Sequence, residues 1–203
     1  MASLTNRQKQ AIKSKLHISN VALNLFKNNP YDDIKITDIC EAANVSVGAF
    51  YHYFKSKEDI ITITYQGLDS LVEEKVLNSS YNSNVEAIID INYQAGLIMR
   101  DMGYGFVSAA YQLMMKQDNP ITTDYNRPSY KLLDKHIKLA VENGEIESKY
   151  EVEELVHYLM LVGRGVMLDW CLVQGEYDIA EAISKHIKNC IILININDKK
   201  VEL

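Results

Sequence analysis

The side chains best suited to contact another molecule lie between Ile36 and Lys57, in the run ITDICEAANVSVGAFYHYFKSK. Tyr51, His52 and Lys57 carry a hydroxyl, an imidazole and an ammonium group, and all three can donate hydrogen bonds to phosphate oxygens. Gly48 stands where a helix would begin. A glycine inside a helix lowers the stability of that helix by about 1 kcal/mol relative to alanine. A glycine retained there indicates that a partner comes close to the backbone, and a nucleic-acid groove is one candidate.

Two short helices joined by a tight turn would position these side chains. Thr37 is a suitable N-cap for the first helix, with Asp38 in its first turn, where the helix dipole favours a negative charge. Asn44 tolerates the left-handed backbone conformation of a turn, and Ser46 can cap a second helix that runs through Phe54. This arrangement is that of a helix-turn-helix.

A longer helix is predicted to precede this unit, over residues 6–28, with an apolar stripe formed by Ile18, Val21, Ala22, Leu25 and Phe26. The stripe should close a three-helix core with Ile36, Ile39, Val45, Tyr51 and Phe54. A fourth helix should begin after Ser56, with an acid three residues on, and continue to about Asn78. It is long enough to connect a head to a body.

Taken together, these residues resemble the TetR family of bacterial transcriptional regulators. The resemblance covers roughly residues 12 to 62: Phe26 at the end of the first helix, Tyr31 in the turn, the run quoted above, and then Glu58 and Asp59. Pro30 and Asn44 stand where the family usually has glycine. Both are residues that turns accept, so the fold is not in doubt.

The resemblance implies a role in DNA binding for eight residues. Val47, Gly48 and Ala49 match the exposed end of the recognition helix, where base edges are contacted. The positions that match phosphate contacts are Thr37, Ser46, Tyr51, His52 and Lys57. For Tyr51 an alternative is open, because its ring could lie in the core with only the hydroxyl at the surface.

The whole chain is predicted to be all-α, with a three-helix DNA-binding head at residues 1–56 joined by a long helix to an effector-binding and dimerisation body at residues 57–203. Its composition is that of a globular protein, with 47% hydrophobic and 24% charged residues among 203, and only three prolines. Breaks at glycine, proline and asparagine predict further helices at 85–102, 104–117, 127–143, 151–174 and 177–196.

The net charge of −6 is unevenly distributed along the chain. Residues 1–60 carry eight basic and six acidic side chains, whereas the remainder carries thirteen basic and twenty-one acidic ones. This asymmetry suits a DNA-reading head on a body that repels DNA. No signal peptide or membrane span is evident, so a cytoplasmic location without membrane association is expected, and the three dispersed cysteines are expected to be free thiols.

Aromatic and methionine side chains on the middle helices predict a site for an apolar or aromatic small-molecule effector. The candidate ligand-binding residues are Tyr93, Met99, Tyr104, Phe106, Tyr111, Met114, His136 and Tyr158. The alternative is that these side chains are ordinary core residues, because helical spacing produces the same pattern.

The last two helices are apolar on more than one side, and such helices need two partners. A second copy of the chain is a natural one, through a symmetric four-helix interface. The predicted dimer contacts are Leu155, Leu159, Val162, Val166, Trp170, Ile183, Ile187 and Ile191.

The sequence thus favours a homodimeric repressor that binds a palindromic double-stranded DNA operator and is released by a small-molecule effector. The alternative is a helical ligand-binding or interaction dimer whose head is only structural. An enzyme is the third hypothesis, but the sequence contains no phosphate-binding loop or nucleophile elbow, and only Glu154 and His157 form a carboxylate–histidine helical pair. No catalytic residue, metal or cofactor is expected.

Overall fold

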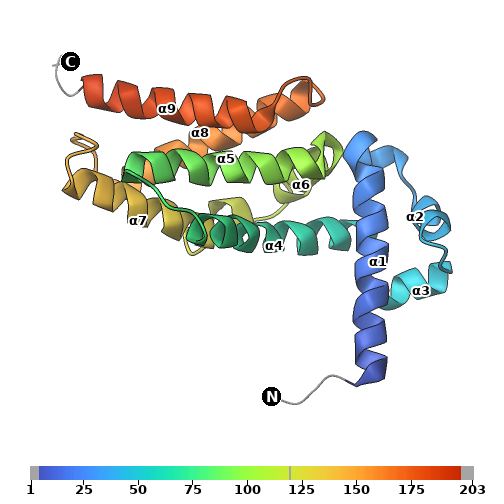
Figure 1. The fold of residues 1–203 in the computed structure, drawn as a ribbon. Coiled ribbons are helices and arrows are strands. Elements are labelled where there is room, and N and C mark those ends of the chain that lie inside the picture. Colours follow the sequence, from blue (N-terminus) through green and yellow to red (C-terminus); the bar gives the residue numbers. More distant parts are fainter. Residues whose placement is uncertain (1–4, 119, 198–203) are drawn as a thin grey trace.

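The computed structural model describes residues 5–118 and 120–197, and within these ranges the regular elements are helices (Figure 1). In chain order the α-helices are α1 (Asn6–Asn28), α2 (Ile36–Ala42), α3 (Val47–Tyr53), α4 (Lys57–Leu77), α5 (Asn84–Met102), α6 (Tyr104–Met114), α7 (Pro128–Glu142), α8 (Val152–Leu172) and α9 (Ile179–Asn197). Short 3-10 turns, η1 (Tyr31–Asp33) and η2 (Ile121–Thr123), precede α2 and α7. The predicted all-α class is confirmed.

The head is a three-helix unit in which α2 packs against both α1 and α3. Ile18, Ala22 and Phe26 of α1 are fully buried, as its apolar spacing predicts. One expectation for this core is wrong: Tyr51 is 54% exposed, and its neighbour Phe50 is completely buried instead. The short helix α3 therefore turns Phe50 into the core, against the ring of Phe54, and Tyr51 outward.

The turn between α2 and α3 has the predicted geometry. Asn44 adopts a φ of 52°, in the left-handed region that asparagine tolerates. Ser46 is the N-cap of α3, and its hydroxyl accepts a hydrogen bond from the backbone N–H of Ala49 at 3.1 Å. The start of α2 differs from expectation, because Lys35 is its N-cap and Thr37 lies one residue inside the helix.

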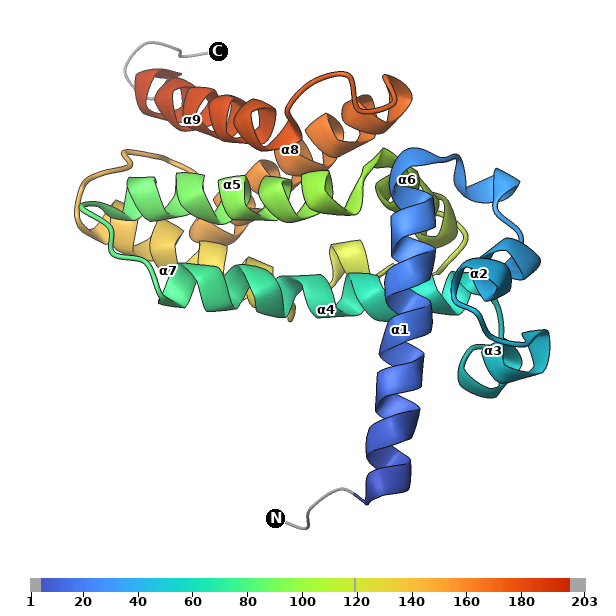
Figure 2. The same ribbon diagram turned by 45° about the vertical axis from the view of Figure 1, so that its right-hand side comes forward.

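The body is a helical bundle in which α5 is central. α5 packs most extensively against α9 and also contacts α7 and α4, while α8 packs against α6, α7 and α9. In Figure 1 and Figure 2, α4, α5 and α9 run along the body, and α1 stands upright at the end of the body where α4 begins. Only α4 passes continuously from the head into the body, as predicted.

A second contact joins head and body, where α6 begins against the C-terminal end of α1. Gly105 lies so close that a Cβ atom there would overlap the carbonyl oxygens of Phe26 and Asn29. Gly103, with a φ of 83°, presses in the same way on Lys27. Any larger side chain would force α1 and α6 apart, so these glycines fix the head against the body.

By length and composition alone, α8 could cross a membrane. Only 28% of its most apolar window is buried inside the protein. It nevertheless carries Arg164, whose side chain reaches across to the backbone of Thr122. α8 thus combines a polar contact inside the body with apolar residues exposed on its other side.

Candidate DNA-binding and effector sites

The N-terminal turn of α3 presents an exposed surface. Ser46, Val47 and Gly48 are exposed and Ala49 is half-buried, and nothing but the Ser46 hydroxyl would come within 4 Å of a Cβ atom at Gly48. Tyr51 and His52 are exposed on the same short helix. The buried ring of Phe50 anchors the helix, so these side chains form an outward face of hydrogen-bonding groups and small residues.

Lys57, in contrast, is engaged within the head. Its ammonium group donates hydrogen bonds to the backbone oxygens of Tyr31 at 2.7 Å and Ile34 at 2.8 Å, and lies 4.0 Å from the centre of the Tyr31 ring. The side chain therefore ties η1 to the start of α4. Its predicted phosphate contact would require these bonds to break, which makes Lys57→Ala a test of head stability as well as of binding.

Two further exposed residues border this face. Thr37 is exposed in the first turn of α2, with its hydroxyl 3.5 Å from the Asp38 carboxylate. Lys55 is exposed between α3 and α4 and was not singled out from the sequence. Its position directly after Phe54, the C-cap of α3, could have identified it as a cation near that helix.

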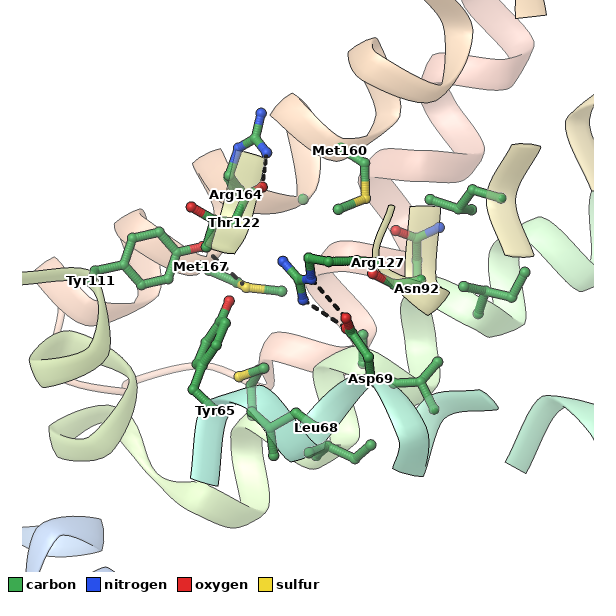
Figure 3. A pocket seen from close by; sticks show the side chains of 18 residues that line it. Tyr65, Leu68, Asp69, Asn92, Tyr111, Thr122, Arg127, Met160, Arg164 and Met167 are labelled. Carbon is green, nitrogen blue, oxygen red and sulfur yellow. Dashed lines mark hydrogen bonds and ion pairs between the residues drawn. The ribbon is translucent and has the colours of Figure 1, made fainter. Parts of the chain in front are cut away.

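A small cavity of about 70 Å³ lies in the body between α4, α5, α6, α7 and α8 (Figure 3). Most of its lining is apolar, from residues that include Leu68, Val72, Met99, Met160 and Met167. Tyr65 lines this cavity and also a larger open cleft of about 520 Å³, formed with α6 and the segment before α7. Tyr65 is thus shared by the two spaces.

A buried ion pair crosses one wall of the cavity. The guanidinium of Arg127 donates to both carboxylate oxygens of Asp69, at 2.6 Å each, and the two side chains are only 10% and 9% exposed. Figure 3 shows this two-pronged contact beside the Tyr65 hydroxyl. Asp69 belongs to α4 and Arg127 is the N-cap of α7, so the pair fixes the linking helix to the body.

Arg164 brings a second guanidinium to the cavity lining. One of its nitrogens donates to the Thr122 carbonyl and to the Tyr130 hydroxyl, both at 2.8 Å. These acceptors are uncharged. Burial raises the pKa of the Tyr65 phenol although Arg127 opposes this, and burial likewise raises the pKa of Tyr111, so both remain neutral hydroxyl donors.

Two of the eight predicted ligand residues, Met99 and Tyr111, line the small cavity. Met114 lines the open cleft, Phe106 is fully buried core, and Tyr104 lies beside Gly175 near Trp170. The others lie elsewhere: Tyr93 is half-buried, His136 is bonded to Asn84 at 3.1 Å, and Tyr158 is 47% exposed. The sequence analysis thus named two of the residues that line this cavity, and it named none of the charged ones, Asp69, Arg127 and Arg164.

The predicted dimer contacts lie mostly inside the single chain. Exposure is 4% or less for Leu155, Leu159, Trp170, Ile183, Ile187 and Ile191, and Val162 and Val166 are half-buried. The six buried residues face this chain's own core, so a partner could not contact them directly. The large apolar residues exposed on α8 and α9 are Tyr158, Leu161, Leu168, Leu172, Ile192 and Leu193.

Comparison with known proteins gives a consistent result. Residues 18–62 match the model of a family described as bacterial regulatory proteins, tetR family. The chain is 23% identical over 175 residues to the HTH-type transcriptional regulator UidR of Escherichia coli (strain K12), a match that covers 82% of this chain and 86% of UidR.

Solved structures share the fold. The fatty acid degradation regulator FadR from Bacillus halodurans superposes with a TM-score of 0.68 at 16% identity, covering 88% of this chain and 94% of that one. The transcriptional regulator FadR from Bacillus subtilis in complex with stearoyl-CoA gives 0.62 at 18% identity, covering 87% and 97%. The likeness therefore extends over head and body together.

Proposed function

Because this chain is a TetR family regulator, we propose that it is a cytoplasmic repressor that binds a palindromic operator as a homodimer and is released by a small-molecule effector. The observation that carries the DNA-binding part is the outward face of α3, where Ser46, Val47 and Gly48 are exposed beside Tyr51 and His52. Two such helices in a dimer would enter successive major grooves, about 34–36 Å apart.

The effector part of the proposal rests on the small cavity in the body. It is mostly apolar and contains a few polar groups, which is the usual character of a small-molecule site. A fold neighbour was solved with stearoyl-CoA, and this supports a body that receives an apolar ligand. The ligand would act by favouring a conformation in which α4 and the head are displaced.

DNA binding is tested on sequences selected from a random pool, by fluorescence anisotropy at two salt concentrations. We expect a palindromic consensus. Tyr51→Phe removes one hydrogen bond, so it should weaken binding roughly 5- to 10-fold, and His52→Ala should also weaken it. Affinity should fall as salt rises, because phosphate contacts release counterions.

Lys131→Ala is the matched control for this experiment, because it removes an exposed residue on the body helix α7 and should leave DNA binding unchanged. If no sequence is enriched, or if the head variants bind as well as wild type while remaining folded, the head is structural only.

The proposed dimer face is revised to the exposed apolar residues of α8 and α9. Tyr158, Leu161 and Leu193 line one surface groove, and their exposure on two adjacent helices suits a four-helix contact. Leu161→Glu should therefore turn the dimer into monomers in sedimentation velocity. Leu77→Glu, which changes a leucine 68% exposed at the end of α4, should leave it dimeric, and a dimer that survives Leu161→Glu would refute this face.

A further inference from the structure

The cavity in the body carries an unbalanced positive charge. Among the described residues that line it, the ionised side chains are Arg127, Arg164 and Asp69. Asp69 neutralises Arg127, whereas Arg164 is bonded to a carbonyl and a hydroxyl. Arg164 is half-buried, and none of its hydrogen bonds goes to a carboxylate among the described residues, so the site is electrostatically suited to one additional negative group.

Unused hydrogen-bond donors lie at the start of α7. The third guanidinium nitrogen of Arg127, Nη1, is 3.4 Å from the Ile121 oxygen, which is a long contact for a group with two protons to donate. The Ser129 hydroxyl, two residues later, is buried and has no hydrogen-bond partner among the described residues. No side chain caps α7, and its N-terminus also favours an anion. A carboxylate would satisfy these groups together.

The cavity is nevertheless small in this conformation. Its volume of about 70 Å³ is well below the roughly 300–1,000 Å³ of typical small-molecule sites. The lining methionines Met99, Met160 and Met167 can change rotamer, but the polar wall is held by the contact between Asp69 and Arg127. A ligand that needs Arg127 must therefore compete with Asp69.

We propose that the effector is an organic acid, with a carboxylate on an apolar body, that replaces Asp69 on the guanidinium of Arg127 and so releases α4. This inference rests on the proposed function and names its ligand class. Once displaced, Asp69 can regain water only if α4 shifts or turns away from α7. Since α4 leads directly into the head, exchange of one carboxylate for another links the cavity to DNA binding.

The ligand class is tested first without DNA. Octanoate and phenylacetate are compared with octanamide and 2-phenylacetamide, which have the same apolar bodies but no charge, by calorimetric titration and by the shift in Tm. Both acids should bind, and each should bind roughly tenfold or more tightly than its amide, because hydrogen bonds to a charged acceptor are the stronger ones.

Variants then test the competition. Asp69→Asn removes the internal competitor, so it should bind the acids several-fold more tightly than wild type and should hold selected DNA less tightly even without acid. Arg127→Gln alone would leave Asp69 buried without its partner, so the double variant Asp69→Asn/Arg127→Gln is used, and it should lose the preference for acid over amide. Asp134→Asn, at an exposed acid on α7, is the matched control and should behave as wild type.

Three results would overturn the proposal. These are equal binding of acids and amides, failure of both acids to bind wild type and Asp69→Asn, and unchanged or weaker acid binding by Asp69→Asn. A fourth result, tight acid binding that leaves selected DNA bound, would refute the release of α4 while preserving the ligand class. Absence of any selected DNA sequence would instead count against the regulator function itself.

Discussion

Arg127→Ala is expected to lower the free energy of unfolding by about 3–5 kcal/mol, because it leaves the Asp69 carboxylate buried without its partner. Both side chains of this pair are at most 10% exposed, and two hydrogen bonds of 2.6 Å join them. The loss follows less from the attraction that is removed than from the carboxylate that stays behind without solvation. Urea unfolding followed by circular dichroism at fixed protein concentration measures it.

Arg100 provides a matched control on the same body. Its guanidinium also bonds an aspartate, Asp178, at 2.7 Å, but these side chains are 44% and 41% exposed. Such surface pairs contribute about 0–1 kcal/mol, so Arg100→Ala should cost correspondingly little. Equal losses in Arg127→Ala and Arg100→Ala would show that burial gives the Asp69 pair no special energetic role. A neutral pair, Asp69→Asn/Arg127→Gln, should recover much of the stability lost in Arg127→Ala.

Local signals explain why so much of the fold could be predicted from the sequence. The predicted bounds of the first helix coincide with those of α1, and the N-cap at Ser46 and the left-handed turn at Asn44 are confirmed. Each of these features depends on residues within a few positions of one another. Helix breaks at Gly103 and Gly175 are equally local, and both residues adopt positive φ angles.

The parts that were missed depend on contacts between distant positions. Asp69 and Arg127 are 58 positions apart, and nothing in the residues around either one indicates the other. Lys57 reaches backbone oxygens 26 and 23 positions away, so its engagement inside the head was equally hidden. For the apolar stripes of α8 and α9, periodicity identifies a buried face but cannot tell whether the same chain or a second copy covers it.

Which of the two adjacent aromatic residues in α3 is buried also depends on contacts with distant parts of the chain. Phe50 is fully buried whereas Tyr51 is 54% exposed, and their rings meet edge to face at 5.6 Å. Phe50→Ala should therefore lower the free energy of unfolding by about 3–5 kcal/mol through loss of burial and creation of a cavity. It should also abolish DNA binding, because α3 loses its anchor.

Tyr51→Ala separates stability from recognition. An exposed substitution of this kind changes stability by about 0.5 kcal/mol, so the head should stay folded while selected DNA is bound more weakly. Urea unfolding and fluorescence anisotropy on the same two variants distinguish the effects. If Tyr51→Ala destabilises the protein as much as Phe50→Ala does, the Tyr51 ring belongs to the core, and the outward face of α3 would lose its principal hydrogen-bonding group. If only DNA binding falls, Tyr51 lies at the DNA interface while Phe50 holds the helix that presents it.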